Sequence, residues 1–432
     1  MSTLDKKVST EESLIETLSA YPDKVGFVRD DVLTSALKYI EENSVPDAKH
    51  EEYKYCNISG LLKKNFKSFH SANSSFSKEE IHSFLLNDSI NIVLVNGKYN
   101  KELSDNYAAE DGLYIHSIEN TPDNLKDNYL SRKKNLGTDY FEALSTAFSG
   151  RGICIEIGKG SSLSKPIHLL HLNSSEKCAV VSARNLIVLQ ENSTLQLFET
   201  FIQNGKENIF NPVLSEVFLA KESTLHHSRL QNQGTHGFHV NNFFVFQEEQ
   251  SSYTNDTIIL EGELVRNNLV VSLQGQEAET KLNGLFIAAN NQLIDNHTVV
   301  DHAVPNCNSN ELYKGILNGK SNGVFNGKIF VQPYAQKTNA YQSSKNILLS
   351  DDASINTKPQ LEIYADDVKC SHGTSTGMLD EEALFYLKSR GIGEENAKRL
   401  LLYAFASEII DQLPESSFSE KVSALFNSKL HI

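Results

Sequence analysis

The sequence predicts a mainly β protein with helical segments at both ends. Short apolar stretches recur between residue 150 and about residue 362, and Gly and Asn residues typical of turns separate them. Helical spacing of apolar residues is nearly absent from that stretch, whereas it is present on both sides of it. Many short strands without helical crossovers are typical of a sandwich, a barrel or a β-helix.

The N-terminal region, residues 1–149, is predicted to be mostly helical. Apolar residues recur at helical spacing in Glu11–Ala20, Asp30–Asn43 and Asp139–Phe148. Pro46 follows the second of these helices and ends it. Ile90–Val95 is a short apolar segment before an Asn-Gly turn signal, so it is predicted to be a strand.

The central region, residues 150–363, is predicted to be the β core. Its expected strands are Ile153–Ile157, Ile167–Leu172, Asn185–Leu189, Thr194–Phe198, Val213–Leu219, Phe243–Phe246, Thr257–Leu260, Leu269–Leu273, Leu285–Ile287 and Lys328–Val331. In a solenoid with coils of roughly 20–25 residues, this region would form about nine or ten coils. No exact repeat is visible, so periodicity alone does not separate a β-helix from a large sandwich.

The C-terminal region, residues 364–432, is predicted to be helical again. Leu384, Phe385 and Leu387 lie in one helical segment, which Arg390–Gly393 interrupts. Glu394–Leu413 follows as a strongly amphipathic helix that ends before Pro414, and a short helix is expected over Ser419–Phe426. The expected apolar stripe of the long helix consists of Ala397, Leu400, Leu401, Ala404, Phe405 and Ile409.

Composition excludes several classes of function. The 432 residues include 40 Lys and Arg against 55 Asp and Glu, and a net charge of −15 argues against a nucleic-acid partner. No segment approaches the roughly 20 apolar residues of a membrane span, and the polar N-terminus has no secretory signal. Five widely spaced cysteines without a C-x-x-C motif predict reduced thiols and a cytoplasmic protein. No phosphate-binding loop is present, so this chain is not expected to hydrolyse ATP by that route.

Ala365–Gly373 is the densest cluster of chemically reactive side chains. Cys370 and His372 are two positions apart, so they would share one face of a strand and could both meet iron or zinc. Two ligands do not complete a metal site, and a polar hinge is the alternative interpretation. Asp366 and Asp367 either orient His372 or cap the chain locally.

Two further groups of polar residues are weaker candidates. They are His297, Asp301, His302 and Cys307, and His226, His227, His236 and His239. The spacing of the first group matches no metal motif, so a polar turn at the edge of a solenoid is favoured. No carboxylate near the second group in the sequence is placed to orient it, so neutral histidines on a strand surface are favoured.

Five stretches between His302 and Ile392 carry a family signature. They are HAVPNCNSNELYKGIL (His302–Leu317), GVFNGKIFV (Gly323–Val331), AQKTNAYQ (Ala335–Gln342), KPQLEIYADDVKCSHG (Lys358–Gly373) and LFYLKSRGI (Leu384–Ile392). This text resembles the SufB/SufD family of iron–sulfur assembly scaffolds. The resemblance implies a right-handed parallel β-helix for residues 150–363, flanked by helical segments.

The resemblance also implies partners. They are a SufB-type paralogue, with which the chain would form a heterodimer, and a SufC-type ABC ATPase that uses ATP. A homodimer is possible when the chain is isolated. The terminal helices would bind the ATPase, with Leu384, Phe385, Arg390, Gly391, Leu401 and Phe405 as the expected contact residues.

Two local differences favour the SufD branch of the family. SufB sequences carry Gln-Cys-Asp where this chain has Gln342-Ser343-Ser344, and Glu-His-Glu where it has Cys370-Ser371-His372. The resemblance then implies that His372 contributes to cluster assembly at the interface with the paralogue, with Cys370 beside it. The chain would be a non-catalytic scaffold that holds no cofactor stably alone and shares a transient iron–sulfur cluster with its partner.

Two other functions stay open at this point. A β-helix is also the architecture of polysaccharide lyases and hydrolases, which would need two or three carboxylates on one coil face near basic residues or calcium. A purely structural adaptor for the ATPase, with an inert Cys370 and His372, is the other alternative.

Overall fold

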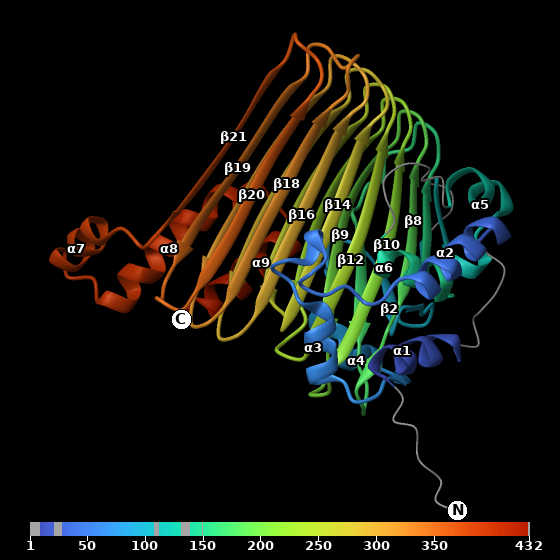
Figure 1. Ribbon diagram of the computed structural model, residues 1–432, viewed down its shortest axis with the longest axis horizontal. Coiled ribbons are helices and arrows are strands. Elements are labelled where there is room, and N and C mark those ends of the chain that lie inside the picture. Colours follow the sequence, from blue (N-terminus) through green and yellow to red (C-terminus); the bar gives the residue numbers. More distant parts are fainter. Residues whose placement is uncertain (1–8, 21–27, 108–111, 131–138, 149, 431–432) are drawn as a thin grey trace, which may run out of the picture.

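The chain folds into a parallel β-helix with helices at both ends (Figure 1). The computed structural model describes residues 9–20, 28–107, 112–130, 139–148 and 150–430. Each coil contributes one strand to each of two long sheets, and neighbouring coils pair in parallel. The parallel β-helix implied by the family resemblance is therefore confirmed.

The two sheets alternate along the chain. The first contains β2 (Ile90–Val95), β6 (Ile167–Asn173), β9 (Thr194–Gln203), β11 (Thr224–Asn232), β13 (Ser252–Glu261), β15 (Glu279–Ala288), β17 (Asn308–Leu317), β19 (Asn339–Leu348) and β21 (Lys369–Gly377). The second contains β5 (Gly152–Ile157), β8 (Ala183–Leu189), β10 (Ile209–Leu219), β12 (Gly237–Gln247), β14 (Leu264–Leu273), β16 (Leu293–His302), β18 (Asn322–Val331) and β20 (Ser354–Ile363). Four short strands accompany them: β1 (His70–Ser71), β3 (Lys98–Tyr99), β4 (Leu113–Ser117) and β7 (Ala179–Val180).

The coils are longer than the sequence predicted. Residues paired between neighbouring coils are 279 − 252 = 27 positions apart for Ser252 and Glu279, and 339 − 308 = 31 for Asn308 and Asn339. Most coils contain two strands of about ten residues, each joined by short turns. The β-helix therefore has about eight coils, and the expectation of nine or ten shorter ones was wrong.

Recurring left-handed turn residues build one corner of the solenoid. Each precedes a strand of the first sheet and has a positive φ: Asn192, Glu222, Gln250, Glu277, Asn306 and Lys337. Most of these residues are not Gly or Asn, so the conformation costs energy that neighbouring coils must offset. The backbone N–H of Asn192 donates to Lys221 at 3.0 Å and that of Lys337 donates to Asp367, so each corner is tied to the next.

Helical elements precede and follow the solenoid in the chain. The N-terminal helical elements are α1 (Thr10–Ser19), α2 (Asp30–Glu42), η1 (Glu51–Tyr53), α3 (Ile58–Asn65), α4 (Lys78–Ile81), η2 (His82–Phe84), η4 (Ile118–Asn120), α5 (Asp123–Tyr129) and α6 (Tyr140–Phe148). The C-terminal ones are α7 (Glu381–Ser389), α8 (Glu394–Ile410) and α9 (Ser417–Lys429). No helix among the described residues is long and apolar enough to cross a membrane.

Three apolar clusters hold these parts together. One fills the inside of the solenoid, from Ile92 to Phe325. A second packs the N-terminal helices on the outer face of the second sheet, where the ring of Phe141 meets that of Phe210 at 5.5 Å. A third packs α8 and α9 on the outer face of the first sheet. The predicted helices over residues 11–20, 30–43 and 139–148 and the strand Ile90–Val95 all lie within one residue of α1, α2, α6 and β2.

The last coil is uncovered. Strand β20 pairs with β18 and β21 pairs with β19, and in the described part of the chain no strand pairs on their other side. Most residues of β21 are exposed, and Figure 1 shows this strand at the edge of the solenoid beside α7. Strand β21 also lies beyond residue 363, where the β core was predicted to end.

The buried face of α8 differs from the predicted stripe. Ala397 and Ile409 are buried as expected, but Leu400 is 50% exposed and Ala404 is exposed. The buried residues of α8 are Ala397, Leu402, Ala406, Ile409 and Ile410. Apolar residues lie on several sides of this helix, so the sequence alone did not show which side would meet the sheet.

Candidate functional site

Cys370 and His372 lie on the last strand, β21, and face the inside of the solenoid. They are in register with Ala340 and Gln342 of β19, which are both buried. Residues in register on neighbouring parallel strands point to the same side, so Cys370 and His372 share the inward face. His372 is nevertheless exposed, because no further coil covers this end.

This pair is an incomplete metal site on its own. Among the residues that the structure describes, no three His, Cys, Asp or Glu side chains group as ligands for one metal. Burial raises the pKa of the Cys370 thiol, and a backbone hydrogen bond from Ala340 offsets part of that effect. Cys370 is therefore mainly a thiol at neutral pH, and a metal at this end needs ligands from a second molecule.

Asp366 and Asp367 belong to the turn before β21. The backbone N–H of Asp367 donates to the Gln336 side chain at 2.9 Å, and its carbonyl accepts from Lys337. No hydrogen bond joins either carboxylate to His372 among the described contacts. The structure therefore supports a local role in the turn for the Asp367 backbone.

The structure disperses His297, Asp301, His302 and Cys307. His297 lies on the outer face, 2.9 Å from Asp295, whereas the inward-facing His302 contacts Ser309 at 2.9 Å. Asp301 accepts from Gln332 at 3.0 Å. These side chains have separate partners and are not grouped at one site. The favoured interpretation of a polar turn was wrong for His297, Asp301 and His302, which lie on β16, whereas Cys307 lies in the turn before β17.

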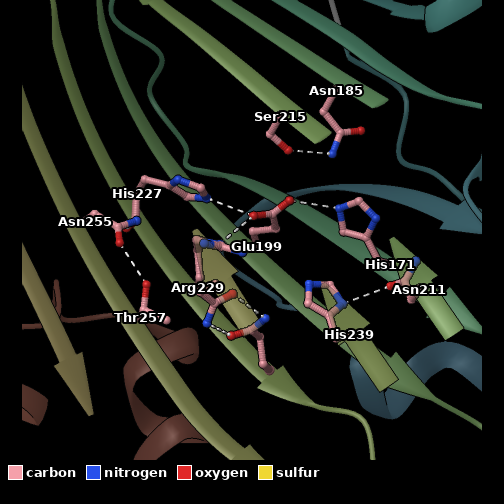
Figure 2. Close-up of polar contacts among 12 residues, drawn as sticks. His171, Asn185, Glu199, Asn211, Ser215, His227, Arg229, His239, Asn255 and Thr257 are labelled. Atoms are coloured by element: carbon pink, nitrogen blue, oxygen red, sulfur yellow. Dashed lines mark hydrogen bonds and ion pairs between the residues drawn. The ribbon is translucent and has the colours of Figure 1, made fainter. Parts of the chain in front are cut away.

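Two of the four histidines in the second group have carboxylate partners, so the expectation of unoriented surface histidines was wrong for these two. His226 contacts Asp256 at 2.6 Å. His227 contacts Glu199 at 3.2 Å (Figure 2). His227 and His239 are fully buried inside the solenoid. The sequence hid these pairs because the partners lie 28 to 30 residues apart, one coil away.

Glu199 is the centre of a buried ionic cluster. It accepts hydrogen bonds from His171 at 2.9 Å, from His227 at 3.2 Å and from Arg229 Nε at 3.0 Å (Figure 2). The side-chain oxygen of Asn241, in the flipped amide orientation, accepts from both terminal nitrogens of Arg229, at 2.6 and 3.1 Å. Arg229 also lies 5.2 Å from the centre of the Phe243 ring. The charge of Arg229 is thus compensated inside the apolar core.

The protonation states of this cluster follow from burial and charge. Burial alone would raise the pKa of Glu199, but hydrogen bonds from His171 and His227 and the charge of Arg229 hold it well below its usual value. Burial lowers the pKa of His239 to about 3, with Arg229 adding to that effect. Glu199 is therefore ionised and His239 neutral at neutral pH.

A second buried glutamate, Glu311, lies nearer the open end. It accepts from Thr298 Oγ1 at 2.7 Å and from Gln342 Nε2 at 3.2 Å. Burial raises its pKa to about 7, and these two hydrogen bonds offset only part of the effect. The sequence analysis singled out neither Glu199 nor Glu311. A charged residue at an inward position of a strand could have indicated them. The sequence alone did not show which positions face inward, because the strand register was not known.

The C-terminal helices expose part of their apolar surface. No residue of α7 is buried, and Phe385 is 73% exposed. Arg390 and Gly391 are exposed in the turn after α7, whereas Leu384 and Leu401 are half-buried. Phe405 is also half-buried; Lys314 of β17 donates to its carbonyl at 2.7 Å and lies 4.5 Å from its ring centre. Phe385 thus faces solvent, whereas Phe405 is held against β17 by Lys314.

Sequence comparisons identify the class of protein. The family model for the SufBD core domain of the SUF system of FeS cluster assembly matches residues 171–405, and that for the SufBD N-terminal region matches residues 23–169. Together they span most of the chain, including both glutamates and the last strand. The chain therefore belongs to the SufBD family of iron–sulfur cluster assembly proteins.

Individual relatives narrow the assignment to the SufD type. The chain is 30% identical over 399 residues to the iron–sulfur cluster assembly protein SufD of Escherichia coli (strain K12), covering 91% of each chain. It is 31% identical over 392 residues to the SufBD family protein slr0076 of Synechocystis, covering 88% of this chain and 86% of that one. It is also 28% identical over 425 residues to the chloroplastic protein ABCI7 of Arabidopsis thaliana, covering 95% and 88% respectively.

Proposed function

We propose that this chain is a non-catalytic scaffold subunit, which pairs with a SufB-type paralogue and binds a SufC-type ABC ATPase. The observation that carries the proposal is the uncovered last coil, where β20 and β21 expose unpaired backbone groups beside Cys370 and His372. Natural proteins rarely leave long strand edges unprotected, so this edge is suited to pairing with another β-helix. In the isolated chain, a second copy could occupy the same edge.

The cluster is the cargo of this site. The imidazole of His372 and a thiolate from the paralogue would hold iron at the interface, because soft thiolates and imidazoles both suit iron. Cys370 is the second candidate ligand on this chain. The cluster is transient and shared, and no cofactor is proposed to stay on the isolated chain.

The exposed apolar surface of α7 and the adjacent turn is proposed as the ATPase-binding element. Phe385 and Tyr386 of α7 are 73% and 57% exposed, and Met378, which precedes α7, is 70% exposed. Large apolar side chains exposed in this way are typical of protein interfaces. ATP used by the partner would shift the relative positions of two ATPase subunits. That motion would reach the cluster site through α7 and α8 and expose Cys370 and His372.

An anaerobic affinity purification from the native host tests the complex. Mass spectrometry should identify an ABC ATPase and a SufB-type chain bound to the tagged protein. Phe385→Ala should lose the ATPase but keep the paralogue, whereas Tyr114→Ala, an exposed aromatic on β4, should keep both. Recovery of the tagged chain alone at low salt would contradict the proposed function.

The role of His372 is tested in the reconstituted complex. His372→Ala should lower the yield of cluster formed from iron and sulfide while the complex stays intact. Ser371→Ala, at the next position and on the opposite face of β21, is the matched control and should behave like the wild type. A full cluster yield with His372→Ala would favour the purely structural adaptor. No observation on the described residues favours the polysaccharide-degrading alternative.

A further inference from the structure

Glu311 lies directly behind the proposed assembly site, two strands below β21. It is on the inward face of β17, 1% exposed, and in register with Gln342 of β19, which is in register with His372 of β21. Glu311 and Gln342 are joined by a hydrogen bond of 3.2 Å. One carboxamide therefore separates the buried carboxyl group from the exposed histidine.

The carboxyl group of Glu311 lacks a counter-charge. Among the described residues it forms no ion pair, unlike Glu199 with Arg229. Its Oε1 has no hydrogen-bond partner there, and neither has Oε1 of Gln342. Two buried acceptors without a donor are costly, and a proton bound to the carboxyl group supplies the missing donor.

The groups that face Glu311 do not supply a cation either. Thr298 from β16 and Gln342 from β19 are neutral hydrogen-bond donors. Tyr313 on the same strand is the titratable neighbour, and burial raises its pKa far above neutrality. Lys314, the next residue, points outward to Glu408 of α8. Beyond β19, Cys370 and His372 are the further titratable groups that the described part of β21 places on this inward face.

We propose that Glu311 is a positioning residue that exchanges a proton and thereby sets, through the Gln342 carboxamide, whether His372 donates a hydrogen bond to Gln342 or accepts one from it. This inference rests on the proposed role of His372 in cluster assembly. A buried residue of β17 would thereby influence the assembly site on β21.

The two states of Glu311 present different atoms to β21. When Glu311 is ionised, it accepts from the Gln342 amide, and the Gln342 oxygen is free to accept from an N–H of His372. The other ring nitrogen then keeps its lone pair for a metal. When Glu311 is protonated, it donates to the Gln342 oxygen, and the amide turns to β21 and donates to the lone pair of His372. The proton is exchanged with solvent at the uncovered end, and no other bond changes.

The first experiment follows the Gln342 side-chain amide by NMR in the isolated full-length chain with ¹⁵N-labelled glutamine. The amide does not titrate itself, so its shift reports the state of Glu311 between pH 5.5 and 8.5. A shift with a midpoint near pH 7 is expected in the wild type, and its loss is expected in Glu311→Gln. Asp301→Asn is the matched control, because Asp301 also accepts from a glutamine amide, that of Gln332, but lies on the outer face. A wild-type Gln342 amide that does not shift with pH overturns the proposal.

The second experiment measures cluster formation by the reconstituted complex at pH 6 and pH 8. Wild type and Asp301→Asn should form cluster faster at pH 8, and Glu311→Gln should reduce the ratio of the two rates by about fivefold, the worth of one hydrogen bond. An unchanged ratio in Glu311→Gln overturns the coupling while the proposed function stands. If the wild-type complex forms no cluster at either pH, the proposed function fails, and the role of Glu311 in it fails too. The pH-dependent shift of the Gln342 amide would still show that Glu311 and Gln342 are coupled. Failure of the proposed function is therefore distinguishable from failure of the Glu311 proposal.

Discussion

Glu199 and Glu311 are both buried on inward positions of the first sheet, yet their pKa values are shifted in opposite directions. Glu199 has Arg229 and two histidines around it, and its pKa is held well below the usual value. Glu311 has only neutral donors, and burial raises its pKa to about 7. The difference lies in the partner one coil away: Arg229 is in register with Glu199, whereas Leu282 and Gln342 flank Glu311.

The comparison shows how a solenoid can tune a carboxyl group. Each inward position has one neighbour above and one below at the spacing of parallel strands, so a single substitution in the next coil changes the charge environment. The cluster around Glu199 lies in the middle of the solenoid, where a fixed charge pair is suited to a static core. Glu311 lies near the open end, where a group that titrates near neutral pH can respond to solvent and partner.

The largest expected effect is a loss of stability at acid pH, caused by buried histidines inside the solenoid. Burial lowers the pKa values of His168 and His239 to about 3. The unfolded chain binds these protons below pH 6.5 and the folded chain does not, so stability falls as the pH drops from 6.5 towards 3. The difference of 6.5 − 3 = 3.5 units corresponds to about 5 kcal/mol for each histidine.

Urea unfolding of the wild type at pH 7, 5.5 and 4.5 measures this loss. His168→Gln should flatten the pH dependence, whereas His82→Gln, an exposed histidine in η2, should leave it unchanged. A pH dependence of His168→Gln equal to that of the wild type would mean that His168 is not held neutral in the folded chain.

The next largest effect is expected for Glu199→Gln at pH 7. This change leaves the charge of Arg229 buried without a counter-charge, which costs about 3–5 kcal/mol. The loss is measured by urea unfolding. The double change Glu199→Gln with Arg229→Leu should recover much of the stability, because removing both charges avoids the unpaired one. If the single and double variants are equally unstable, the ion pair is not the reason.

These buried groups also show how far the sequence alone could predict the molecule. The strands that it located, such as β8 and β10, have apolar residues on both faces. Strands β11, β17 and β19 were missed because inward positions hold His227, Glu311 and Gln342, which break the apolar alternation. Strand β21 was missed because it is polar, as an uncovered strand can be. Cys370 and His372 were found from a local motif, whereas Glu199 and Arg229 are 30 residues apart and meet only in the folded coil.

The smallest of these effects concerns Glu311, and its sign is opposite to that of Glu199. A folded-state pKa of about 7 lies above the usual 4.5, so the folded chain keeps a proton that the unfolded chain has lost. Stability therefore falls as the pH rises from 4.5 to 7 and is constant above that. The difference of 7 − 4.5 = 2.5 units corresponds to about 3 kcal/mol.

Glu311→Gln should remove this fall and be more stable than the wild type above pH 8. Urea midpoints at pH 5.5 and 8.5 measure this change in stability. Asp301→Asn is the control: burial also raises the pKa of Asp301, but this residue is only half-buried, so its effect on stability should be smaller. If Glu311→Gln is instead less stable than the wild type at pH 8.5, an unseen cation compensates the carboxylate. The contrast with Glu199 would then disappear, since both glutamates would be paired.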